Sequence, residues 1–161
     1  MIQKATIAEI VGTAIEKYVP EEQRLVAALA ERIAASRYRA WAETIGDEDH
    51  RSTLQRCAER EEEIAQRVES LHPNAAALQE QMLKDNPDLQ NQYLGLFDGL
   101  ALPDQFALQA EAERTGAAAW QSFADECSDP KSAEKLRSCA PLEETNASDL
   151  EQIIASMTAA P

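Results

Sequence analysis

Apolar residues recur three or four positions apart through most of the chain, which is the spacing of an amphipathic helix. The pattern predicts a short N-terminal helix over 6–19, a hairpin of two long helices over 20–71 and a second hairpin over 103–158. Proline and glycine interrupt residues 72–102, so we expect a crossover there with two short helical pieces around 75–84 and 89–97. The expected fold is therefore all-α, with a single domain over 1–161.

Prolines are expected to set two helix boundaries. Pro20 should end the first helix and open the next one, because proline is well placed in a first helical turn. Pro141 lacks the backbone N–H that a continuous last helix would need, so it should kink or break that helix. Residues 148–151 read as a capping box, which predicts that the helix restarts there and that Glu143 moves away from the core.

Composition supports helix and narrows the range of partners. Aromatic residues make up only 5% of the chain, while Ala, Glu, Gln and Leu dominate, a mixture that favours helix over strand. The net charge of −14, without any cluster of Lys or Arg, argues against a nucleic-acid or anionic-membrane partner. Three cysteines without a pairing pattern, and an N-terminus without a secretory pattern, predict a cytoplasmic protein with reduced thiols.

The two predicted hairpins resemble each other at an offset of 82 positions. Thirteen of the forty aligned positions between 30–69 and 112–151 are identical, more than this composition alone would produce. The match begins with the same tripeptide, Ala-Glu-Arg, at 30–32 and 112–114. We therefore predict an internal duplication of the hairpin.

Each of the four long helices carries one acid on its apolar face: Glu31, Glu61, Glu113 and Glu143. Within each hairpin the two acids lie fifteen residues before and after the turn, and a helix rises about 1.5 Å per residue, so they should lie at the same height. Buried carboxylates cost several kcal/mol unless positive charge or shared protons neutralise them. Two divalent cations would balance four negative charges.

The pattern AERxxAxxYRxWA, the thirty residues between the acids of each hairpin and the duplication resemble the ferritin-like superfamily, which includes rubrerythrins and encapsulated ferritins. The resemblance covers about 21–71 and 103–158. It implies a four-helix bundle with one long crossover and a dinuclear iron or manganese site. The implied metal ligands are Glu31, Glu61, Glu113 and Glu143, with Tyr38 and Trp120 beside them, and the implied chemistry is iron oxidation or a peroxide reaction.

Histidine is missing where this resemblance would place it. The third position after each second-helix acid holds Ile64 in the first hairpin and Asn146 in the second, and His50 and His72 lie at other heights. The amide oxygen of Asn146 is a candidate ligand. An oxygen-only donor set favours hard cations such as Mn²⁺, Mg²⁺, Ca²⁺ or ferric iron and holds ferrous iron less well.

Several neighbouring residues allow two interpretations. Glu62 and Glu144 are either secondary ligands or solvated surface residues, because they lie about 100° around the helix from the apolar face. Cys57 and Cys139, one turn before the second-helix acids, are either soft ligands or small packing residues.

The main alternative is a non-catalytic structural or interaction bundle without metal. In that case the acids would be paired with basic groups such as Arg32 and Arg114 after a metal site was lost.

The apolar face of the helix over 6–19 would either cover the bundle or pair subunits in a homo-oligomer.

Overall fold

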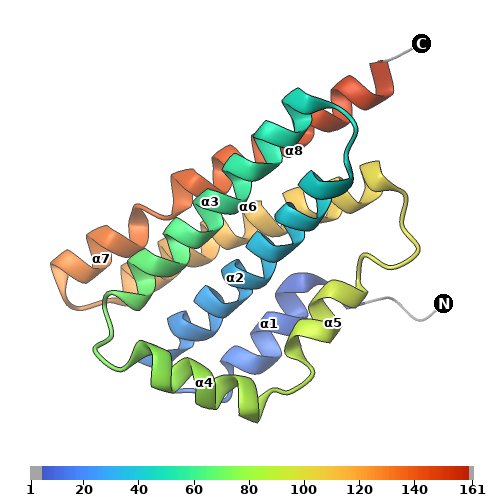
Figure 1. Ribbon diagram of the computed structural model, residues 1–161. Coiled ribbons are helices and arrows are strands. Elements are labelled where there is room, and N and C mark those ends of the chain that lie inside the picture. Colours follow the sequence, from blue (N-terminus) through green and yellow to red (C-terminus); the bar gives the residue numbers. More distant parts are fainter. Residues whose placement is uncertain (1–4, 160–161) are drawn as a thin grey trace.

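The computed structural model describes residues 5–159, and all regular structure in that part of the chain is helical. Figure 1 shows the helices α1 (Ile7–Ile15), α2 (Pro20–Thr44), α3 (Glu48–Glu69), α4 (Ala75–Asp85), α5 (Leu89–Gly95), α6 (Leu102–Glu126), α7 (Pro130–Arg137) and α8 (Ala140–Ala159). The all-α prediction is confirmed for these residues. None of these helices is long and apolar enough to cross a membrane. The expected domain also includes 1–4 and 160–161, which lie outside the described residues.

The helices begin at the caps and prolines that the sequence provides. Thr6, Asp47 and Asp129 precede α1, α3 and α7, and each side chain accepts a hydrogen bond from the backbone N–H three residues on. Pro20 and Pro103 lie in the first turns of α2 and α6, where a missing N–H costs little. These local signals place most helix starts within one residue of the prediction.

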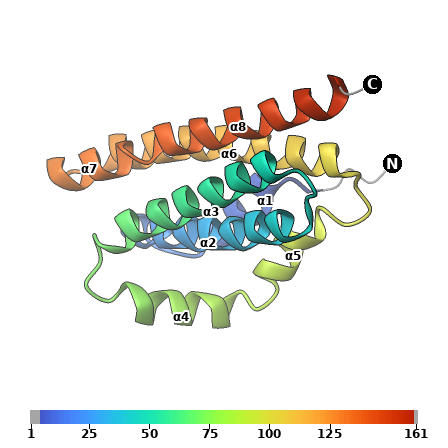
Figure 2. The same cartoon turned by 45° about the horizontal axis from the view of Figure 1, so that its top comes forward.

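Two helical hairpins form the body of the protein. In the first hairpin α2 packs along α3, and in the second α6 packs along α7 and α8. Figure 2 shows the hairpins as two layers, with α3 of one layer against α7 and α8 of the other. The crossover helices α4 and α5 pack on α2, and α1 contacts α2, α5 and α6. The arrangement is an all-α bundle with a helical crossover and an added N-terminal helix.

The first helix is shorter than predicted. It ends at Ile15, and residues 16–18 form turns in which Lys17 and Tyr18 donate backbone hydrogen bonds three residues back. Val19 is extended, with φ −66° and ψ 153°, as expected for a residue before proline. Pro20 restricts only Val19, and α1 ends before that residue, at Ile15.

Pro141 breaks the last helical region, as predicted, but the helix restarts earlier than expected. Helix α7 ends at Arg137 and α8 begins at Ala140, so Pro141 occupies the first turn of α8. Ser148 lies inside α8 and caps nothing. The expected restart at 148–151 is therefore wrong, and Glu143 remains in the first turns of α8.

A layer of acids divides the apolar core. One apolar cluster surrounds Tyr38, Trp41 and Phe106, and the other surrounds Ile64 and Trp120. On each long helix, the acid lies between a residue of one cluster and a residue of the other. The flanking pairs are Ala28 and Ala34 on α2, Cys57 and Ala65 on α3, Ala110 and Ala117 on α6, and Ala140 and Ala147 on α8. The acids thus sit at one level across the bundle.

Candidate metal centre

The four acids predicted from the sequence come together inside the bundle. Glu61 is fully buried, Glu113 and Glu143 are 1% exposed, and Glu31 is 9% exposed. Carboxylate oxygens of Glu31, Glu61 and Glu143 lie within 4.8 Å of one another. Glu113 is not part of this group of three, but it lies close enough to interact electrostatically with each of them. The spacing argument therefore predicted their convergence, while their role as metal ligands stays a prediction.

Neutral donors orient two of these carboxylates. The hydroxyl of Tyr38 and the amide Nε2 of Gln109 both donate to Glu113 Oε1, each over 2.7 Å. The indole Nε1 of Trp120 donates to Glu143 Oε1 over 2.7 Å. The aromatic residues two turns after the first-helix acids thus act as hydrogen-bond donors as well as packing groups.

Among the described residues, two buried carboxylate oxygens have no hydrogen-bond partner, Oε2 of Glu61 and Oε2 of Glu113. An unpartnered buried polar atom normally costs about 1–3 kcal/mol, and more where it is charged. Such atoms are rare in folded proteins, and a bound ion or water is one explanation for them. Two free oxygens in a cluster made only of oxygen acceptors fit a cation.

The pairing of the acids with Arg32 and Arg114, which the metal-free alternative predicted, is wrong. Within residues 5–159, none of the ion pairs includes any of the four acids. Arg32 instead pairs with Glu69, and Arg114 pairs with Glu151. Each arginine follows its acid by one residue and so projects from the exposed side of the helix.

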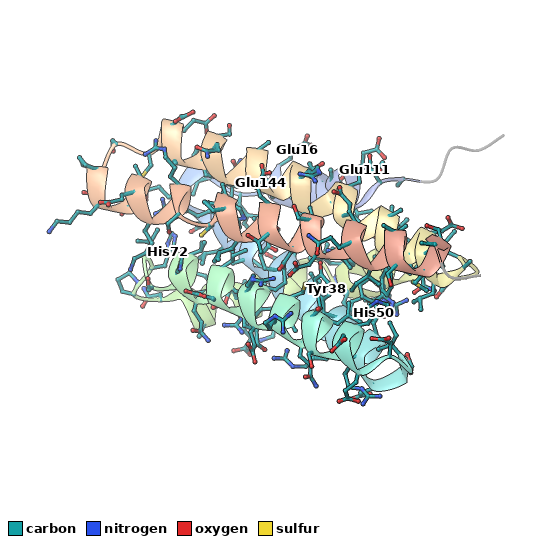
Figure 3. The ribbon with its side chains drawn as sticks, turned by 90° about the horizontal axis from the view of Figure 1, so that it is seen from above. Glu16, Tyr38, His50, His72, Glu111 and Glu144 are labelled. Carbon is teal, nitrogen blue, oxygen red and sulfur yellow. The ribbon has the colours of Figure 1, made fainter. Side chains whose placement is uncertain are left out.

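The secondary acids lie outside the cluster. Glu62 pairs with Arg39, and Glu144 pairs with Arg114 with 60% of its side chain exposed. Figure 3 shows Tyr38 in the middle of the bundle, with His50 and His72 toward its opposite ends. Neither histidine lies with the acids in the cluster of side chains that could hold a metal ion.

Asn146 orients an acid and does not offer its oxygen to the cluster. Its Nδ2 donates to Glu61 Oε1, and its Oδ1 accepts a 3.1 Å hydrogen bond from Arg60. The reverse amide orientation would place two acceptors together at Glu61 and two donors together at Arg60. The amide oxygen therefore faces Arg60 here, and its role as a ligand stays a prediction. Ile64, the equivalent residue of the first hairpin, is buried in the apolar core.

Burial shifts the protonation of the cluster. Desolvation raises the pKa of the Glu31 carboxyl, and for Glu61 and Glu143 the negative charges of the neighbouring acids add to desolvation and raise the pKa well above the usual value. In the absence of a cation, Glu31, Glu61 and Glu143 therefore keep their protons to higher pH than an exposed glutamate does. A bound cation would replace those protons.

Both cysteines near the acids behave as packing residues. Cys57 and Cys139 are fully buried. Burial raises the pKa of both thiols, that of Cys139 to about 12, so neither is a thiolate at neutral pH. Neither belongs to the group of possible metal ligands.

Three residues at the site were missed by sequence reasoning. Gln109 is 2% exposed and lies one turn before Glu113 on the same face, so its position on an apolar stripe was a usable signal. Tyr93 donates to Gln109 from the crossover helix α5, a tertiary contact that no local pattern reveals. A Cβ on Gly116 would lie 2.7 Å from Glu143 Oε1, so glycine makes room for that carboxylate.

Comparisons of this chain with protein families, with curated proteins and with solved structures find no match. Assignment of a function therefore rests on the geometry of the site.

Proposed function

We propose that this chain is a ferritin-like carboxylate-bundle protein that binds one or two metal ions, manganese or iron, through Glu31, Glu61, Glu113 and Glu143. The observation that carries the proposal is the approach of three carboxylates to within 4.8 Å inside an apolar core. The two hairpins, the helical crossover and the single layer of acids support the ferritin-like assignment. An iron-oxidising or peroxide-related activity belongs to the same proposal.

The donor set favours a hard cation. Every group able to bind a metal in the cluster is a carboxylate oxygen, and oxygen donors suit Mn²⁺ and ferric iron better than softer ions. The hydrogen bonds from Tyr38, Gln109, Trp120 and Asn146 would hold the carboxylates in place around such an ion.

A non-catalytic structural bundle is the competing function. Ile64 and the engaged amide of Asn146 favour it, because they stand where the resemblance implies imidazole ligands. The two functions differ in their response to metal, since a cation that binds only the folded state must stabilise it.

Manganese binding tests the proposal directly. Purified protein is stripped with chelator, loaded with Mn²⁺ or Fe²⁺ under anaerobic conditions, desalted and analysed for bound metal. We expect one or two ions per chain and at least about tenfold weaker binding by Glu31→Gln. Glu144→Gln serves as the matched control, because Glu144 is an exposed acid beside Glu143. Protein that retains no metal and gains no thermal stability with either ion would support the structural function instead.

Gly116→Ala is expected to weaken Mn²⁺ binding without loss of folding stability. The added Cβ would displace the Glu143 carboxylate, while alanine favours the helix by about 1 kcal/mol over glycine. Titration with Mn²⁺ and thermal unfolding measure the two effects separately. Gly12→Ala is the control, because a Cβ there meets no atom within 4 Å. Equal Mn²⁺ affinity in both variants would show that Glu143 does not contribute to binding.

A further inference from the structure

A pocket of about 270 Å³ lies under α1 and reaches the acids from the α6 side of the bundle. Its walls are mainly apolar, with Ile7, Val11 and Ile15 of α1 facing Ala30, Ala112 and Ala119 of α2 and α6. The small alanine side chains leave the space that the pocket occupies. A cavity of about 150 Å³ holds benzene, so this pocket has room for an aromatic ring with a short arm.

The inner end of the pocket is acidic. Glu31, Glu113 and Glu143 all line it. Glu113 is 1% exposed, and both of its donors, Tyr38 and Gln109, bind Oε1. Its Oε2 is buried without a hydrogen-bond partner, so a ligand that reaches the inner end of the pocket can supply one when this side chain turns toward it.

The mouth of the pocket carries an exposed acid as well. Glu111, labelled in Figure 3, lies one turn along α6 from the pocket residue Thr115 and lines the pocket itself. With a chain charge of −14, the approach to the pocket favours cations over anions. Apolar walls, an acidic mouth and an unpartnered acceptor at the inner end together specify the ligand.

We propose that this pocket binds a small primary amine with an apolar tail, whose ammonium group lies against Glu31, Glu113 and Glu143 and pairs with Glu113. The tail replaces water against the apolar walls, and the head supplies both the hydrogen bond and the positive charge that the acids lack. A carboxylate head would be repelled, and a hydroxyl head would supply the hydrogen bond without the charge. The proposal does not depend on metal binding, but an amine and a metal ion would compete for the same acids.

Binding of 2-phenylethylamine to the chelator-treated protein tests the amine site. This probe joins a benzene ring to a short ammonium arm, and 2-phenylethanol and 3-phenylpropionate match it in shape with a neutral and an anionic head. Calorimetric titration should show saturable binding of the amine and at least about tenfold weaker binding of the other two. Absence of amine binding, or equal binding of the alcohol, would overturn the proposal.

Two variants locate the ligand in this pocket. Glu113→Gln should weaken amine binding at least about tenfold, whereas Glu126→Gln, at the exposed end of α6, should leave it unchanged. Gly12→Leu should abolish amine binding, since Gly12 lines the pocket and a side chain there meets open space. Gly12→Ala controls for the change in helix propensity. Unchanged amine binding in Glu113→Gln or in Gly12→Leu would contradict the assignment.

Binding measurements with Mn²⁺ distinguish the amine site from the proposed metal site. In the wild type, Mn²⁺ should weaken amine binding, and Gly12→Leu should still bind Mn²⁺ while it loses the amine. Mn²⁺ binding without amine binding would overturn the amine site alone, and the reverse result would overturn the metal site alone. If the protein bound Mn²⁺ and the amine at the same time with unchanged affinities, the two ligands would not share the acids.

Discussion

Glu61→Gln is expected to stabilise the metal-free protein and to remove the stabilisation that Mn²⁺ gives to the wild type. Glu61 is fully buried, its Oε2 has no partner, and neighbouring acids raise the pKa of its carboxyl. Glutamine keeps the acceptor for Asn146 and places an N–H donor near Glu31. At pH 8 the gain should be on the order of 2 kcal/mol, which is about 4–8 °C in melting temperature for a chain of this size.

The order of stability should reverse when Mn²⁺ is added. The wild type gains RT ln(1 + [Mn²⁺]/Kd), which is about 2.7 kcal/mol at a hundredfold excess over Kd, while the variant gains little. Thermal unfolding of both proteins, with chelator and with Mn²⁺, measures this reversal in their order of stability. Glu144→Gln should follow the wild type in both conditions, because its side chain is exposed. If metal-free Glu61→Gln were less stable than the metal-free wild type, burial of the Glu61 carboxyl would not be an uncompensated cost.

The sequence predicted those parts of the fold that depend on local signals. Asp47 and Asp129 cap α3 and α7 through local side-chain hydrogen bonds, and the constant rise of an α-helix sufficed to place Glu31 and Glu61 at one height. Duplication of the same spacing extended the argument to the second hairpin. The break at Pro141 was predictable for the same reason, since it follows from one missing N–H.

The details around the acids could not be predicted because they depend on contacts between distant helices. At three positions around the acids, the second hairpin has a polar residue or a glycine where the first has an apolar side chain: Gln109, Gly116 and Asn146 stand against Ala27, Ala34 and Ile64. Alignment of the hairpins shows these differences, but only the folded chain shows that all three face the acids. The restart of α8 at Ala140 was missed for a different reason, because the capping-box pattern at 148–151 indicated a later start.

The free energy of unfolding of the metal-free protein is expected to fall as pH rises above about 5, for as long as the buried acids keep protons that the unfolded chain has released. Burial raises the pKa values of Glu31, Glu61 and Glu143 in the folded state, whereas a glutamate in the unfolded chain titrates near pH 4.3. Above that pH the folded state binds more protons than the unfolded state, so stability decreases with pH. Each extra proton steepens the decrease by about 1.4 kcal/mol per pH unit, until the folded-state carboxyl itself ionises.

Urea unfolding at several pH values measures this slope, and Glu61→Gln separates the cluster from the rest of the charge. The chain carries a net charge of −14, so general repulsion also grows with pH, but it grows almost equally in both proteins. The variant lacks one titrating acid and should show a shallower decrease. Saturating Mn²⁺ should flatten the wild-type curve, because the ion binds the deprotonated carboxylates and holds them in that form. Identical slopes in the wild type and the variant would mean that the buried acids do not hold protons that the unfolded chain releases.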